Sequence, residues 1–244
     1  MRNLLSWIKA HPYSLWVTYY IPYLICFILL EQFSDPKFII YSPIDDMIPF
    51  CEYFIIFYLM WFPLMFLSLL YFLLKDKDAF IDLCFLMFTG MSISLLIYVI
   101  APNGLDLRVE IASDNLFAWM VRMIQTVDDP TNVCPSIHVA STLAIMMVVL
   151  KHREFRHPLL AKGGVSLISV GIILSTMFLK QHSIIDAAAG IALTLILYVI
   201  TYHTGWRKLF QRTPLRFLVS ERPSAAKKTG SSRSAVSIRH SRPR

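Results

Sequence analysis

The chain has 244 residues, of which 56% are hydrophobic and only 16% are charged, and its formal net charge is +7. This composition is too apolar for an ordinary soluble domain and indicates a membrane protein. Most of the positive charge collects near the C-terminal end, and no base-reading motif accompanies it, so nucleic-acid binding is not favoured.

Six apolar stretches reach or approach the length of about 20 residues that a membrane-spanning helix needs. They cover residues 14–31, 53–74, 79–101, 137–151, 163–180 and 183–203. The fourth stretch is short, and a tight turn must join the last two. The first follows a basic start, but its apolar run is too long for a signal peptide and no small-residue cleavage site follows it, so we expect a retained helix. The sequence predicts an all-α polytopic membrane protein with a bundle of six transmembrane helices.

Lys and Arg are unevenly distributed among the loops. If both chain ends and the loops after the second and fourth helices share one side, that side holds nineteen of these residues and the other side holds four. Positive residues stay on the cytoplasmic side, so we expect both termini to be cytoplasmic. The loops at 32–52, 102–136 and 180–183 are then extracytoplasmic, and the expected location is the plasma (inner) membrane.

Two domains are expected, a membrane domain at residues 1–204 and a basic, disordered cytoplasmic tail at residues 205–244. The tail is rich in Arg, Lys, Ser and Pro and poor in apolar residues after Leu218. It either sets the topology or contacts anionic lipid head groups. The four cysteines have no metal-ligand spacing, and a disulfide between Cys51 and Cys134 is left open because both fall on the expected outer side.

The second outer loop ends with VCPSIHVAST, residues 133–142. Pro135 suits the first turn of a helix, because its missing N–H has no partner there. The N–H groups of Ser136, Ile137 and His138 would then point out of the helix start, where anions and especially phosphate bind. Ser136 adds a hydroxyl donor, and His138 lies beside the anion.

A second polar group, Lys180, His182 and Asp186, lies between and within the last two apolar stretches, in LKQHSIIDAAAG, residues 179–190. His182 and Asp186 are four residues apart and share one face of a helix. A carboxylate that accepts one ring N–H fixes the imidazole tautomer, and the other ring nitrogen is free to act as a base or nucleophile. Lys180 offers an ammonium to the same anion.

Arg108 follows the third apolar stretch and offers a planar fork that matches two phosphate oxygens. The charge bias of the loops places Arg108, the 133–142 stretch and the 179–190 stretch at one membrane face. Cations, a nucleophile, an orienting carboxylate and a general acid are what phosphoryl transfer requires. The sequence thus favours chemistry on a phosphate group held at a membrane surface.

PSIH at 135–138 and KQHSIID at 180–186 together resemble motifs of the type 2 phosphatidic acid phosphatase superfamily, whose members are membrane lipid phosphatases and phosphotransferases. The resemblance covers about residues 96–200, the expected catalytic core. It implies that His182 is the nucleophile, that Asp186 orients it and that His138 protonates the leaving oxygen. It further implies that no metal or other cofactor is needed and that phosphate is bound by Arg108, Ser136, Ile137 and Lys180.

Three departures from the family's motifs stand out. Ile137 replaces a glycine, Thr176 stands where an arginine is expected, and only Arg108 remains of the first motif. We expect Lys180, one turn after Thr176, to supply the missing positive charge.

The leading expectation for function is hydrolysis of a lipid phosphate monoester or pyrophosphate at the extracytoplasmic face through a phosphohistidine intermediate. Phosphatidic acid, phosphatidylglycerol phosphate and a polyprenyl pyrophosphate are candidate substrates. The alternative is a lipid head-group phosphotransferase, similar to inositol phosphorylceramide or sphingomyelin synthases, which would use the same residues. A proton-coupled transporter and an inactive lipid-binding member also stay open. The expected partners are the lipid substrate and the membrane, with no nucleic acid.

Overall fold

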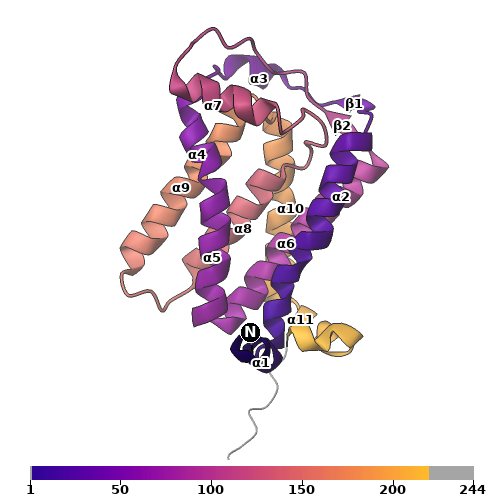
Figure 1. Cartoon of the computed structure of the whole chain (residues 1–244), viewed down its shortest axis with the longest axis vertical. Coiled ribbons are helices and arrows are strands. Elements are labelled where there is room, and N and C mark those ends of the chain that lie inside the picture. The colour runs from indigo at the N-terminus through magenta and orange to yellow at the C-terminus, as the bar shows by residue number, and fades with distance from the viewer. Residues whose placement is uncertain (1, 220–244) are drawn as a thin grey trace, which may run out of the picture.

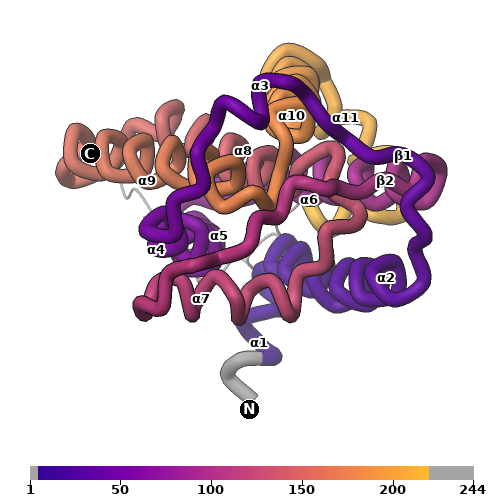
Figure 2. The backbone as a smooth tube through the Cα atoms, turned by 90° about the horizontal axis from the view of Figure 1, so that it is seen from above, coloured from indigo at the N-terminus to yellow at the C-terminus, as the bar shows by residue number. Residues whose placement is uncertain are grey.

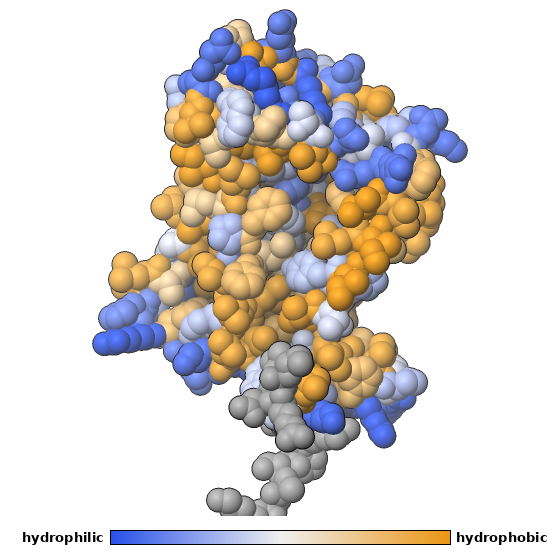
Figure 3. All heavy atoms as spheres, in the orientation of Figure 1, coloured by the Kyte–Doolittle hydropathy of each residue, from blue (hydrophilic) through white to orange (hydrophobic). Residues whose placement is uncertain are grey.

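The computed structural model describes residues 2–219, and most of them are helical (Figure 1). Within this part of the chain, the helical stretches long and apolar enough to cross a membrane are Pro12–Phe33, Glu52–Lys75, Lys77–Ile100, Pro158–Phe178 and Ile184–His203. Apolar side chains form a broad band between two more hydrophilic ends (Figure 3). The chain therefore has the helices of an integral membrane protein, as its composition predicts.

Some spans are single helices and others are composite. The single ones are α6 (Lys77–Ile100), α9 (Pro158–Phe178) and α10 (Ile184–His203). The first span, which follows α1 (Arg2–Ala10), joins η1 (Pro12–Tyr19) to α2 (Tyr20–Phe33). The second joins η2 (Glu52–Phe54), α4 (Ile55–Leu59) and α5 (Trp61–Lys75).

The expected fourth span is a shorter helix than the others. α8 runs over Ile137–Lys151, 15 residues, and is therefore about 22 Å long, less than the hydrocarbon thickness of about 30 Å. It packs against α6, α9 and α10 in the middle of the bundle, and most of its side chains are buried. By length, α8 does not complete the six spans that we expected, so five spans are supported.

Side-chain caps explain where several of these helices begin. Asp76 accepts a hydrogen bond from the Ala79 amide at 3.0 Å at the start of α6, and Pro158 opens α9 with a backbone suited to a first helical turn. Ser183 and Asp186 form a capping box at the start of α10. The Ser183 hydroxyl accepts from a backbone amide of the first turn, and the Asp186 carboxylate accepts from the Ser183 amide. Local chemistry thus determines the start of α10, at the motif that also carries His182.

Segments far apart in the sequence meet at one end of the bundle (Figures 1 and 2). β1 (Phe38–Ile39) pairs in parallel with β2 (Asn103–Gly104), α7 (Leu116–Gln125) lies across the same end, and α3 (Pro43–Met47) passes close to the start of α10. These segments belong to the loops that were expected to share a membrane face. α1 and α11 lie at the other end. Which end faces the cytoplasm stays a prediction.

The beginning of the expected tail is folded. α11 (Trp206–Gln211) and η3 (Pro214–Leu218) pack on the bundle, where Arg207 contacts Asp82 at 2.5 Å and the Trp16 indole donates to the Leu218 carbonyl at 3.1 Å. The expectation of disorder from residue 205 therefore does not describe this part. The rest of the tail and its expected lipid contacts lie outside the described residues.

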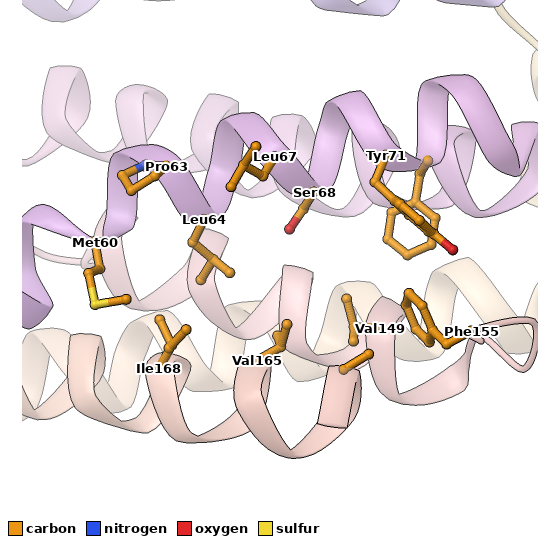
Figure 4. Close-up of a pocket in the computed structure, with 12 residues that line it drawn as sticks. Met60, Pro63, Leu64, Leu67, Ser68, Tyr71, Val149, Phe155, Val165 and Ile168 are labelled. Atoms are coloured by element: carbon orange, nitrogen blue, oxygen red, sulfur yellow. The ribbon is translucent and has the colours of Figure 1, made fainter. Parts of the chain in front are cut away.

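α5, α8 and α9 enclose an apolar groove with a volume of about 290 Å³. Leu64 of α5 and Val165 of α9 point into it from opposite sides, and Met60, just before α5, and Tyr71 of α5 mark its two ends (Figure 4). Met60 to Tyr71 is a stretch of about 16 Å at the rise of an α-helix. The groove thus runs beside the helices for roughly the depth of one leaflet of the membrane.

Candidate active site

Ser136 and Asp186 join the starts of α8 and α10. The Ser136 hydroxyl caps α8 by accepting from the Val139 amide at 3.3 Å, and the Ser136 amide donates to the Asp186 carbonyl at 3.1 Å. Only glycine allows this approach at residue 190, because a Cβ there would lie 2.8 Å from the Ser136 carbonyl oxygen. The two motifs predicted to share a site are therefore held directly against each other.

The binding of the Ser136 amide changes one expectation. This N–H is already used by Asp186 and is not free for an anion. The N–H groups of Ile137 and His138 find no acceptor in the preceding loop among the described residues. Among the described residues, the amides at the start of α8 that remain free for an anion are thus those of Ile137 and His138.

His182 and His138 face each other across the two helix starts. His182 Nε2 lies 3.5 Å from His138 Nδ1, and His182 Nδ1 lies 3.4 Å from Asp186 Oδ2. Both distances are at the long limit of hydrogen bonding. His182 is 7% exposed and Asp186 is fully buried. The carboxylate favours a proton on Nδ1 of His182, which leaves the lone pair of Nε2 directed at His138.

Aromatic residues of the second span hold the His138 ring. The ring centroid of His138 lies 4.7 Å from that of Tyr58 and 4.5 Å from that of Trp61. Trp61 is itself held by a hydrogen bond from its indole to the Ser141 hydroxyl at 2.8 Å, and the Tyr58 hydroxyl donates to Asp128 at 2.7 Å. Tyr58 and Trp61 were not predicted as site residues, since aromatic residues in a span are ordinary packing residues.

Arg108 reaches the same end as a half-buried cation. It donates to the carbonyl oxygens of Gln125 and Asp128 and, at 3.3 Å, to the side-chain oxygen of Gln181, the neighbour of His182. Its Nε is buried without a partner. Burial lowers the pKa of the Arg108 guanidinium, and the negative charge of Asp128 opposes that shift. Arg108 makes no ion pair with a carboxylate among the described residues, so its charge is available to an anion.

Lys180 also lies at this end, but its ammonium has partners that were not expected. It donates to the carbonyl oxygens of Asp45 and Ile48, each at 2.5 Å, and the residue is 7% exposed. Its φ is +57°, a left-handed conformation that costs a non-glycine residue roughly 1–2 kcal/mol. An ammonium has three donors, and two are used here. One donor is left for a phosphate oxygen.

Asp45 is the buried carboxylate that sequence reasoning missed. It lies in the loop at 32–52, is 2% exposed, and accepts from the Ser183 hydroxyl at 2.6 Å and the Ile184 amide at 2.8 Å. Its own helix gave the only signal, a Ser-x-x-Asp pattern from Ser42 that forms a capping box in α3. That pattern indicates a helix start but says nothing of a contact with α10.

Cys51 and Cys134 are both free thiols, so the disulfide that was left open is not formed. Cys134 instead interacts with Asp186, and burial together with this carboxylate raises the pKa of its thiol to about 12. The thiol is therefore protonated near neutral pH. No group of three or more His, Cys, Asp or Glu residues in the described part of the chain has the arrangement of a metal site.

Comparisons with known proteins add no family to this geometry. No family model matches the chain, and neither a curated protein nor a solved structure does. The resemblance carried by residues 135–138 and 180–186 therefore remains an expectation from these motifs, and a proposal for function must rest on the arrangement of the side chains.

Proposed function

We propose that the chain is a membrane enzyme that hydrolyses a lipid phosphate monoester or pyrophosphate through a phosphohistidine intermediate. The observation that carries the proposal is the order Asp186, His182, His138, with consecutive side chains 3.4 and 3.5 Å apart. A carboxylate behind one imidazole and a second imidazole in front of it supply an oriented nucleophile and a general acid.

The proposed reaction has two steps. Nε2 of His182 attacks phosphorus, an N–P bond forms, and the P–O bond to the leaving group breaks while His138 gives its proton to that oxygen. Water, deprotonated by His138, then attacks phosphorus and releases phosphate and free His182. The phosphoryl group must push the two rings apart, because they are in direct contact at 3.5 Å. Arg108, the third donor of Lys180 and the amides of Ile137 and His138 would bind the phosphate oxygens.

Two observations support a lipid as the substrate. The helices of the chain are those of an integral membrane protein, and the apolar groove between α5, α8 and α9 ends at Met60. Met60 precedes Trp61, whose ring packs on His138. The groove would bind a hydrocarbon chain of the substrate while its phosphate lies between the histidines. From the charge bias of the loops, we place this end on the extracytoplasmic side of the plasma membrane.

Filling the groove should impair turnover of long-chain substrates selectively. Val165→Phe places a larger side chain between α9 and α5. If the ring displaces about two methylene groups of the substrate from the groove, at about 0.8 kcal/mol each, kcat/KM should fall about tenfold. The same variant should turn over a short-chain phosphatidic acid at the wild-type rate. Leu167→Phe is the matched control, because Leu167 is on the same helix and 70% exposed. Equal losses for both chain lengths would contradict binding of the chain in this groove.

The proposed function is tested by phosphate release from purified full-length protein in detergent with EDTA present. Phosphatidic acid, phosphatidylglycerol phosphate and a polyprenyl pyrophosphate are the substrates to compare. We expect release from at least one of them, unaffected by EDTA, together with an acid-labile, base-stable phosphoprotein after rapid quenching. Release that stops on addition of EDTA and returns with a metal ion would contradict the proposed mechanism.

A head-group phosphotransferase is the second candidate, and the burial of the candidate nucleophile supports it. His182 is 7% exposed and Asp186 is fully buried, so little water surrounds the nucleophile in this state. A lipid hydroxyl that arrives from the membrane could then replace water in the second step. If no substrate in the panel releases phosphate, supplying a lipid acceptor with the donor distinguishes transfer from an inactive protein.

A further inference from the structure

The α3 segment, from the first outer loop, is bound to the turn that carries His182. Asp45 of α3 accepts from the Ser183 hydroxyl at 2.6 Å and from the Ile184 amide at 2.8 Å. The Ser42 amide donates to the same carboxylate at 2.8 Å. Asp45 thus accepts hydrogen bonds on both carboxylate oxygens, as a buried charge requires.

Lys180 binds the same segment from the other side of His182. Its ammonium donates to the Asp45 and Ile48 carbonyl oxygens, which lie in and just after α3. The residue two positions before His182 and the residue one position after it are therefore both attached to Asp45. A turn held at both sides has few backbone rotations left, so the direction of the His182 ring depends on this attachment.

The attachment also has an electrostatic basis. Lys180 is a buried cation without an ion pair to a carboxylate among the described residues, and Asp45 is a buried anion. The Asp45 carboxylate lies at the start of α10, where the partial positive charge of the helix end stabilises it. The Asp45 and Ile48 carbonyl oxygens stabilise the ammonium. Separating α3 from the turn would remove these partners from both charges.

We propose that Asp45 is a positioning residue, and that α3 and Lys180 form a clasp that keeps His182 directed at the phosphate. This assignment rests on the proposed function in its description of His182 as the nucleophile. It gives Lys180 a structural role in addition to any contact with the substrate. It also explains why a residue more than 130 positions away in the sequence contacts the turn 180–183.

Asp45→Asn is the variant that tests the clasp, because it keeps the size of the side chain but replaces one acceptor oxygen by a donor. We expect kcat to fall about 10- to 100-fold, by analogy with outer residues that orient the ligands of a metal, with KM changed less than threefold (~0.6 kcal/mol). Asp46→Asn is the matched control, because this substitution removes the same charge from the adjacent position. Asp46 is exposed and binds only Tyr41 among the described residues. The variant should retain wild-type kcat.

A second readout does not require activity. Hydrogen exchange of the peptide covering residues 180–186 in the full-length protein should be faster in Asp45→Asn and unchanged in Asp46→Asn. Should Asp45→Asn fail to fold, Ser42→Ala weakens the capping box of α3 without touching the turn. This variant should shift exchange and kcat in the same direction by a smaller amount.

The outcomes separate the clasp from the proposed function. Unchanged exchange in Asp45→Asn, or a wild-type kcat in that variant of an active enzyme, overturns the clasp. Faster exchange in Asp45→Asn alone supports the clasp even if the wild-type protein releases no phosphate, and in that case only the proposed function fails. If Asp45→Asn raises KM and lowers the thermal stability while kcat is unchanged, Asp45 serves folding, and the positioning role is overturned.

Discussion

His182→Ala is expected to abolish phosphate release, with kcat reduced by about 10⁴- to 10⁶-fold, the scale of removing a covalent nucleophile. Alanine leaves no nitrogen that could form the N–P bond. The phosphoprotein trapped by rapid quenching should disappear in the same variant. Binding of the lipid should survive, because Arg108 and the amides at the start of α8 remain in place.

His157→Ala is the control for this experiment. His157 is exposed at the start of α9 and makes no side-chain cap, so its loss should change neither the activity nor the midpoint of thermal unfolding. Phosphate release by His182→Ala at the wild-type rate would refute the assignment of the nucleophile. Loss of lipid binding together with activity would instead indicate a binding role for this histidine.

Asp186→Asn is expected to reduce kcat by about 10³- to 10⁴-fold, as for an orienting carboxylate in other histidine-dependent enzymes. An amide in this position has no charge to stabilise the imidazolium and can present its NH₂ to Nδ1 of His182, which favours the wrong tautomer. The thermal midpoint should change little, because asparagine keeps a side-chain oxygen that can accept from the Ser183 amide in the capping box of α10. The measurement is kcat beside a thermal unfolding curve.

Asp106→Asn removes the same charge from an exposed loop position at the same end of the bundle, and it should retain activity. A parallel loss in both variants would point to the overall charge of this end and not to the orientation of His182. If Asp186→Asn loses activity and also unfolds at a much lower temperature, the carboxylate is needed for the capping box of α10 and not for the orientation of the imidazole.

The helices of the fold were largely predictable. The exception is the role of α8 as a membrane span, and it has a physical cause. Long apolar stretches identify spans because the bilayer requires them. The stretch 137–151 has the right composition, and the structure ends α8 at these residues. Its position inside the bundle, among α6, α9 and α10, depends on helix packing, which hydropathy does not describe. The count of six was therefore an inference from composition that length does not support.

The candidate site was predictable where its chemistry is local. His182 and Asp186 are four residues apart. His182 lies in the turn just before α10, and this short separation is enough to bring the two side chains together. The partners of Arg108 and Lys180 were not predictable, because they are backbone carbonyl oxygens, 17 and 20 residues away for Arg108 and more than 130 residues away for Lys180. Every residue has a carbonyl oxygen, so no residue type in the sequence marks such a partner.

The amino-acid sequence by itself determined the class of the protein, the extent of most helices and the pairing of His182 with Asp186, because each depends on residues near one another along the chain. Only the tertiary structure decided that His138 lies against His182, that Tyr58 and Trp61 hold His138, and that Asp45 and Lys180 connect the loop at 32–52 to the start of α10. These contacts arise where α8 and α10 approach over Gly190 and where three loops gather at one end of the bundle. They depend on the packing of whole helices, and that packing is set by the sum of many weak contacts across the chain.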